Sequence, residues 1–150
     1  MYLILILFHI LSATIWTGGH LILFFRIYLP AYKTGNPEAV ITFEKAYEPL
    51  GMGSLAILIL TGLLLVYINL PDLSLWLSGV APASNTLIVK LCLLILTALT
   101  ALNARLRIIP HLSAENLGTM GVHIAIVTFL SVAFVITGVM HRYGTLFSFF

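Results

Sequence analysis

The feature that most constrains this chain is a succession of four apolar stretches, each long enough to cross a bilayer as a helix. A hydrocarbon core of about 30 Å takes about 20 helical residues. Proline marks most of the boundaries, where its missing N–H and the restriction on the preceding residue favour a helix end; these prolines are Pro30, Pro49, Pro71 and Pro110. The predicted spans are residues 2–28, 50–70, 86–109 and 119–142.

The composition agrees with a membrane protein of one domain. Of 150 residues, 61% are hydrophobic and 8% are charged, whereas a soluble domain averages about 25% charged residues. Open sheet edges are not tolerated in lipid, so we predict an all-α fold, an integral membrane four-helix up-and-down bundle over residues 1–150. The lipid bilayer is then an obligatory partner.

Several function classes find no support in the sequence. The net charge of +2 is small and spread over the connections, which argues against nucleic acid as a partner. The single cysteine, Cys92, excludes an intramolecular disulfide. No Ser-His-Asp, paired-carboxylate, phosphate-loop or CxxC pattern is present, so hydrolysis and nucleotide chemistry lack a basis.

The distribution of Lys and Arg predicts the orientation in the membrane. Positive charges gather in cytoplasmic loops, and the first and third connections hold most of them. We therefore expect both termini on the periplasmic side of a bacterial inner membrane. The residues on the side of these two connections are Arg26, Lys33, Lys45, Arg105 and Arg107, against Lys90 and Arg142 on the other.

One face of the first span carries side chains that are unusual for a membrane helix. At about 100° per residue, Trp16 lies roughly 20° to one side of His9 and His20 roughly 20° to the other. The two imidazoles are then about 16 Å apart along the axis. Ionisable groups inside a membrane are expensive and usually face a bundle interior, so this stripe is the candidate cofactor face.

The fourth span carries two more histidines on one face, His123 and His141. It runs antiparallel to the first, which puts His20 and His123 within about 3 Å of the same depth and leaves His9 and His141 about 7 Å apart in depth. Facing imidazoles are what bis-histidine haem ligation needs. All four are candidate haem or metal ligands; each also has the plainer interpretation of an interfacial residue or a partner for a nearby carbonyl.

Small and basic residues near the inner pair suggest room and counter-charges for a haem. Six glycines fall in that half of the bundle, and Arg26 and Arg105 are near enough in depth to bind propionates. Glycines equally serve to let membrane helices pack closely, and both interpretations remain open. These glycines are Gly18, Gly19, Gly51, Gly53, Gly118 and Gly121.

Lys90 admits two interpretations. It lies early in the third span, where its side chain could extend to the headgroups. If it instead faces inward, it lies at about the depth of His9 and could hold a cofactor carboxylate or take part in proton transfer.

The motif F-H-I at residues 8–10, followed by Trp16 and Gly18, together with V-K-L at residues 89–91, resembles the CopD and HemJ superfamily of small four-helix membrane proteins. The resemblance implies haem b binding. HemJ proteins are protoporphyrinogen oxidases whose functional His and Lys match His9 and Lys90, and we place Trp16 with Lys90 as candidate catalytic residues. CopD proteins are linked to copper handling. Histidines on the outer helices are also similar to cytochromes b that exchange electrons with quinones.

Four functions follow in order of preference. The first is a b-type haem protein, with one or two haems, that moves electrons to or from a quinone and could act as a haem-dependent oxidoreductase. The second is copper handling or transport, with Cys92, Met140, His9 and His141 as ligands. The third is HemJ-like porphyrinogen oxidation. The fourth is a structural role, as a homo-oligomer or as a subunit of a respiratory complex.

Overall fold

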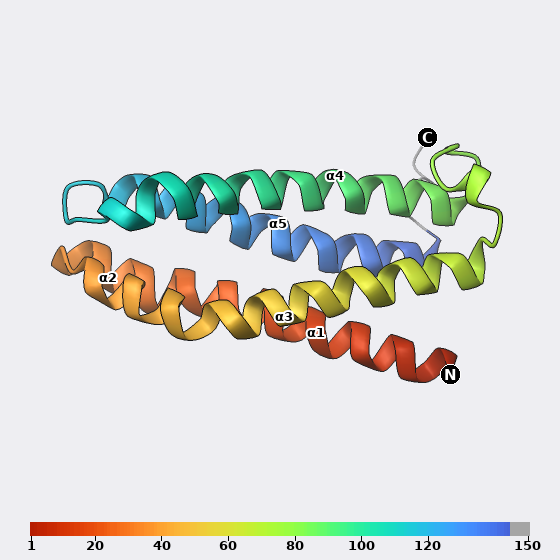
Figure 1. The fold of residues 1–150 in the computed structure, drawn as a ribbon, viewed down its shortest axis with the longest axis horizontal. Coiled ribbons are helices and arrows are strands. Elements are labelled where there is room, and N and C mark those ends of the chain that lie inside the picture. The colour runs from red at the N-terminus through yellow and green to blue at the C-terminus, as the bar shows by residue number, and fades with distance from the viewer. Residues whose placement is uncertain (145–150) are drawn as a thin grey trace.

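The computed structural model describes residues 1–144, which form four long helical spans and no strand (Figure 1). Each span is long and apolar enough to cross a membrane. The predicted all-α four-helix membrane bundle is therefore confirmed. In chain order the elements are α1 (Tyr2–Ile22), the π-helical η1 (Leu23–Tyr28), α2 (Leu29–Thr34), α3 (Pro37–Asn69), the 3₁₀ segment η2 (Leu73–Leu75), α4 (Pro82–Asn103), the π-helical η3 (Ala104–Ile108), the 3₁₀ segment η4 (Ile109–His111) and α5 (Leu117–Tyr143).

The helices continue through two prolines that were expected to bound them. The first span runs without a break to Thr34, past Pro30. A proline ring conflicts with the carbonyl four residues earlier. For Pro30 that carbonyl belongs to Arg26, inside η1, where the helix is widened to the π form. The predicted end at residue 28 is therefore wrong, because the π-helical segment makes room for the ring.

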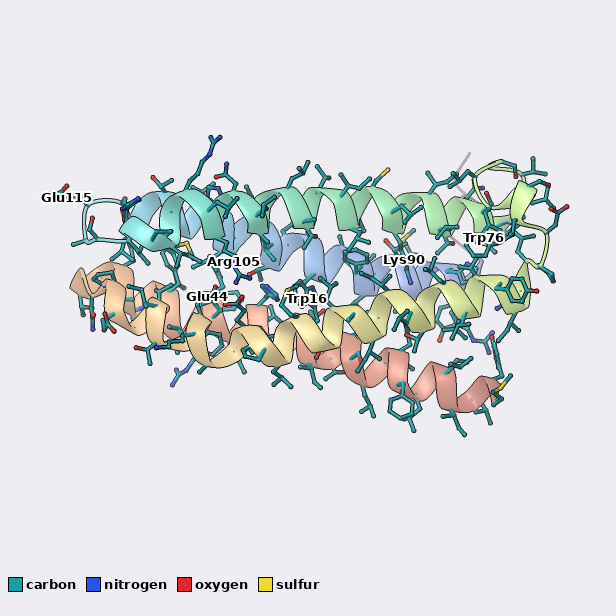
Figure 2. The ribbon with its side chains drawn as sticks, in the orientation of Figure 1. Trp16, Glu44, Trp76, Lys90, Arg105 and Glu115 are labelled. Carbon is teal, nitrogen blue, oxygen red and sulfur yellow. The ribbon has the colours of Figure 1, made fainter. Side chains whose placement is uncertain are left out.

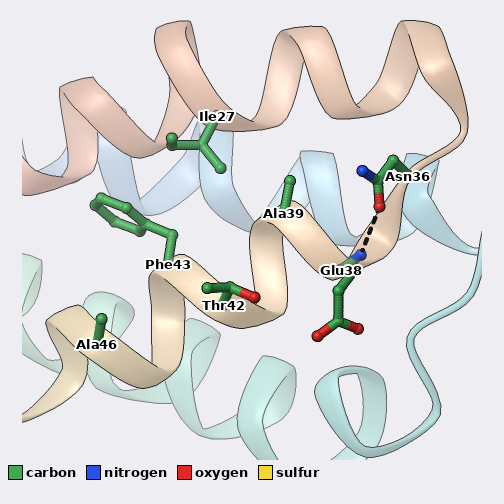
Figure 3. Close-up of a pocket in the computed structure, with 7 residues that line it drawn as sticks. All are labelled: Ile27, Asn36, Glu38, Ala39, Thr42, Phe43 and Ala46. Atoms are coloured by element: carbon green, nitrogen blue, oxygen red, sulfur yellow. Dashed lines mark hydrogen bonds between the residues drawn. The ribbon is translucent and has the colours of Figure 1, made fainter.

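The second span is also longer than predicted. α3 begins at Pro37, and Asn36 caps it by accepting a hydrogen bond of 3.1 Å from the backbone N–H of Glu38 (Figure 3). Asn36, Pro37 and Glu38 together have the sequence pattern of a helix start, with a cap, a proline in the first turn and an acidic residue after it. The expected break before residue 50 is absent, however, and Pro49 lies inside the helix. The third span likewise starts four residues before the predicted boundary, at Pro82.

The four spans form two pairs. α1 packs along α3 and α4 packs along α5, and the pairs meet mainly where α1 contacts α5, whereas α3 and α4 scarcely touch. We call the end that holds the N-terminus, the connection 70–81 and the last turn of α5 the termini end. The opposite end holds the turn at Gly35 and the connection 112–116, and we call it the turn end (Figure 1). Toward the termini end, α1 diverges from α5 in Figure 1.

The connection at the termini end is ordered by local hydrogen bonds. Asp72 accepts hydrogen bonds from the hydroxyl and the backbone N–H of Ser74, which lower the pKa of its carboxyl. The indole N–H of Trp76 donates to the carbonyl of Leu70 at 2.9 Å. The connection therefore folds back on the end of α3.

The apolar core lies at the turn end. It contains buried side chains from both π-helical segments and from the first turns of α5, and it locks the ends of the four spans together. Its members are Leu23, Tyr28, Ala31, Val40, Ala104, Ile108, Leu117, Met120 and Ile124.

Candidate functional site

Two hydrogen bonds between α1 and α5 fix how these helices face each other. The hydroxyl of Thr17 donates to the carbonyl of Ser131 at 3.3 Å, and the hydroxyl of Thr128 donates to the carbonyl of His20 at 3.2 Å. In both pairs the residue numbers add to 148, as they must when two antiparallel helices run side by side. Residue n of α1 therefore faces residue 148 − n of α5.

This register reverses the predicted depths of the histidine pairs. Extended along α1, which diverges from α5 here, this register sets His9 at the level of Val139, two residues from His141, which is about 3 Å along the axis. His20 faces Thr128, five residues from His123, which is about 7.5 Å. The prediction that His20 and His123 match in depth is therefore wrong. The pair at the termini end is the better aligned one.

Lys90 joins the pair at the termini end. Its Nζ lies 3.8 Å from the position that a Cβ would take on Gly138 of α5, next to the residue that His9 faces. This position agrees with the expectation that Lys90 lies at the depth of His9, which stays a prediction because the register is extended from the bonds of Thr17 and Thr128. Its ammonium forms no ion pair within residues 1–144. Figure 2 draws Lys90 between the ribbon of α3 and those of α4 and α5.

A threonine holds each of these two imidazoles. His9 Nδ1 lies 2.8 Å from the hydroxyl of Thr61 on α3, and His141 Nδ1 lies 2.8 Å from the hydroxyl of Thr86 on α4. Both hydroxyls already donate their one hydrogen to a carbonyl of their own helix, at 2.6 and 2.9 Å. Each neutral imidazole must therefore donate from Nδ1, which leaves a lone pair on Nε2.

The two histidines nearer the turn end, His20 and His123, differ from each other in whether Nε2 is free. His20 Nδ1 donates to the carbonyl of Trp16 at 2.7 Å, so its Nε2 also carries a lone pair. His123 Nδ1 donates to the carbonyl of Thr119 at 2.9 Å, but its Nε2 contacts the side-chain amide of Asn103 at 3.1 Å. The atom of Asn103 at this distance is Oδ1, and Nε2 is in hydrogen-bonding contact with the amide whichever way the amide is turned. The Nε2 of His123 is therefore occupied within the protein.

The glycines of this half provide room for tyrosine rings. A Cβ on Gly19 or Gly51 would meet the ring of Tyr47, and a Cβ on Gly121 would meet the ring of Tyr28. For these three glycines the close-packing interpretation describes what they do, whereas a Cβ on Gly18 or Gly53 would meet no atom within 4 Å. Part of the space that was considered for a macrocycle, beside Gly19, Gly51 and Gly121, is occupied by these two rings.

The remaining candidates lie outside both histidine pairs. Arg105 forms an ion pair with Glu48, and both side chains are exposed; Arg26 is exposed as well. Cys92 is exposed on α4. A shallow pocket lined by Ile27, Asn36, Glu38, Ala39, Thr42, Phe43 and Ala46 lies at the turn end (Figure 3), where no histidine contributes to it.

The interior of the termini end is polar. His9 and Lys90 are half-buried, His141 is exposed, and the side chains buried around them are mostly hydroxyls. No group of three or more His, Cys, Asp or Glu side chains suited to a metal ion occurs within residues 1–144. The buried hydroxyl residues in this half of the bundle are Ser12, Thr61, Ser84, Thr86 and Thr137.

Sequence reasoning did not identify the partners of the histidines. Thr61, Thr86 and Asn103 are ordinary polar residues of apolar spans, and only their position opposite an imidazole makes them important. The sequence offers one indication of their role: each of them lies at the same depth in the membrane as a histidine of a neighbouring span. That indication needs the correct register, which the sequence alone did not supply.

Comparison of the chain with models of known protein families, with curated proteins and with solved structures finds no match.

Proposed function

We propose that this chain is a b-type haem protein of the membrane that transfers electrons, with His9 and His141 as the axial ligands. The observation that carries the proposal is the arrangement at the termini end. Two imidazoles on antiparallel spans lie within about 3 Å of the same depth, each held by a threonine hydroxyl through Nδ1. Each therefore has an unused Nε2, the atom that ligates iron in bis-histidine sites.

The donor set fits this group. A ligating histidine usually donates its other ring N–H to an oxygen, which fixes the ring and makes the ligating nitrogen more basic. Thr61 and Thr86 do this for His9 and His141. When bound, haem would supply reversible one-electron redox chemistry.

Lys90 supports the same location. A lysine inside an apolar span is expensive and calls for a counter-charge, yet no carboxylate pairs with Lys90 within residues 1–144. A haem propionate is an anion of the required kind. Lys90 would hold the propionate and thereby orient the ring plane.

The lipid phase would supply the redox partner. We propose that a quinone or quinol exchanges electrons with the haem, because the chain exposes apolar side chains along all four spans. Because Lys and Arg gather mostly at the turn end, the termini end and its site would lie on the periplasmic side of a bacterial inner membrane.

An absorption spectrum of the purified full chain tests the proposal. We expect a Soret and an α band of bis-histidine type in the reduced-minus-oxidised spectrum after incubation with haem b. His9→Ala and His141→Ala should each abolish the α band. His123→Ala is the matched control, a histidine of α5 at the other end, and should retain it.

The same spectra can contradict the proposal. A wild-type protein that takes up no haem overturns it. So does retention of the full α band in both His9→Ala and His141→Ala.

Porphyrinogen oxidation is a second candidate, favoured by the position of the Lys90 Nζ beside Gly138, in the half of the bundle that holds His9. These are the two residues that the resemblance to HemJ proteins marks as functional. Turnover of protoporphyrinogen by the purified chain, lost in Lys90→Met, would support it. Copper handling has no such observation in its favour, because Cys92 is exposed.

A further inference from the structure

The indole of Trp16 is buried without a partner. Its side chain faces the bundle interior from α1 and is only 7% exposed. Its Nε1–H has no acceptor among residues 1–144, and it is the only buried side-chain nitrogen or oxygen there without one. Buried donors are nearly always paired in folded proteins, because an unpaired one is costly. The indole therefore points to a partner that the described chain does not supply.

An unused acceptor lies beside this donor. His20 follows Trp16 by one turn, and its ring centroid is 4.4 Å from that of the indole. Because His20 Nδ1 donates to the carbonyl of Trp16, Nε2 carries the lone pair, and Nε2 makes no hydrogen bond within residues 1–144. Figure 2 draws Trp16 between the ribbons of α3 and of α4 and α5. One donor and one acceptor thus lie on neighbouring rings near the middle of the first span.

The surroundings of this pair are aromatic. The ring of Tyr47 meets that of His20 edge-on, with centroids 6.0 Å apart. The hydroxyl of Tyr47 is engaged, since it donates to the carbonyls of Ile15 and Trp16 at 2.9 and 3.3 Å. A ligand here would meet apolar rings and one donor–acceptor pair, deep within the apolar spans. These are the requirements of a flat, lipid-soluble molecule with one hydrogen-bonding group.

We propose that Trp16 and His20 bind the aromatic hydroxyl of a lipid-soluble hydroquinone. A hydroxyl oxygen accepts from the indole Nε1–H while its hydrogen is donated to Nε2 of His20. The carbonyl of the oxidised quinone accepts from the indole but leaves Nε2 without a donor. The site therefore distinguishes the reduced form from the oxidised form.

This inference deepens the proposed function, because it names the site at which the electron carrier binds. It rests on that function in one respect, that a haem protein of the membrane requires an electron carrier. Binding itself needs no haem. Trp16 and His20 lie nearer the middle of the first span, Tyr2–Thr34, than His9 does, so the two sites can be tested apart.

Tryptophan fluorescence tests the binding. The chain has two tryptophans, so Trp76→Phe leaves Trp16 as the single reporter. The full-length variant is titrated in detergent with duroquinol, with duroquinone and with the dimethyl ether of duroquinol. We expect duroquinol to bind about tenfold more tightly than the dimethyl ether, which cannot donate to Nε2, and also more tightly than duroquinone. Equal affinities, or no change of emission with any of the three, overturn the proposal.

Variants in the same background separate this site from the haem site. His20→Phe keeps an aromatic ring and should reduce the affinity for duroquinol to that for the dimethyl ether, whereas His123→Phe should leave it unchanged. His9→Ala should still bind duroquinol. Its failure to do so, with helicity retained in circular dichroism, contradicts a separate site. A wild-type chain that binds duroquinol but no haem overturns the proposed function and leaves this inference standing.

Discussion

At the turn end the helices meet through a closed set of apolar side chains, whereas at the termini end many of the inward-facing side chains carry nitrogen and oxygen atoms. The turn end contains both π-helical segments, and tyrosine rings fill the space above its glycines. The termini end contains a lysine and two histidines with little apolar packing around them. One half of the bundle thus stabilises the fold, and the other half is arranged as a site.

The comparison shows why a count of histidines does not locate a site in a membrane bundle. His123 lies in an apolar span as the other candidates do, but Asn103 occupies its Nε2. His9 and His141 carry threonine partners on Nδ1 and keep Nε2 available. The second hydrogen bond of each ring therefore decides between a structural and a ligating role.

The largest effect that would sharpen this comparison is expected at Lys90. Replacing an unpaired lysine of a span by methionine removes a charge that costs about 3 kcal/mol in a membrane helix. Lys90→Met should therefore stabilise the haem-free protein, measured as a higher midpoint of thermal unfolding in detergent, while it weakens haem binding. Lys33→Met, at the exposed turn end, is the control and should change neither. A marked loss of stability in Lys90→Met would show that the lysine has a structural role.

The threonine that holds His9 provides the next test. Thr61→Val keeps the shape but removes the oxygen that accepts from Nδ1, and the loss of such a partner weakens ligation about 10- to 100-fold. Titration with haem b should show this decrease. Thr97→Val is the matched control, since Thr97 is also buried but bonds only to its own helix, at the carbonyl of Leu93. Equal haem affinities in the two variants would contradict the role of Thr61 as the hydrogen-bond acceptor that holds His9.

At the turn end, the expected effect is on stability and not on the cofactor. A Cβ on Gly121 would overlap the ring of Tyr28, and overpacking of this kind destabilises by about 1–3 kcal/mol. Gly121→Ala should lower the unfolding midpoint and leave the haem spectrum unchanged. Gly18→Ala meets no atom within 4 Å and should be neutral or stabilising by up to about 1 kcal/mol. Identical midpoints for the two variants would argue against tight packing at this end.

The smallest effect is expected at the surface of the turn end. The ion pair between Glu48 and Arg105 is exposed, and such pairs contribute about 0–1 kcal/mol. Glu48→Gln should therefore leave the unfolding midpoint nearly unchanged, as Glu115→Gln should. A large loss of stability or of haem in Glu48→Gln alone would place Arg105 back among the residues that hold the cofactor.

Hydropathy and proline positions were sufficient to predict the four spans and the fold class, because the bilayer fixes helix length and excludes open sheets. The depths of the histidines were predicted wrongly for one reason. The helix continues through Pro30 to Thr34, which moves the midpoint of the first span from residue 15 to residue 18. The midpoint of Leu117–Tyr143 is residue 130, and residues 18 and 130 face each other in the register that the hydrogen bonds set. Rotations of the helices about their axes are not encoded in the pattern of one chain, so the threonine partners could not be predicted.

The redox potential of two methionine variants tests most directly that the site lies at the termini end. Methionine in place of one axial histidine raises the potential of a haem. We predict that His141→Met retains haem and raises its midpoint potential, whereas His123→Met leaves the potential of the wild type unchanged. A raised potential in His123→Met together with an unchanged potential in His141→Met would contradict this location and place the iron at the turn end.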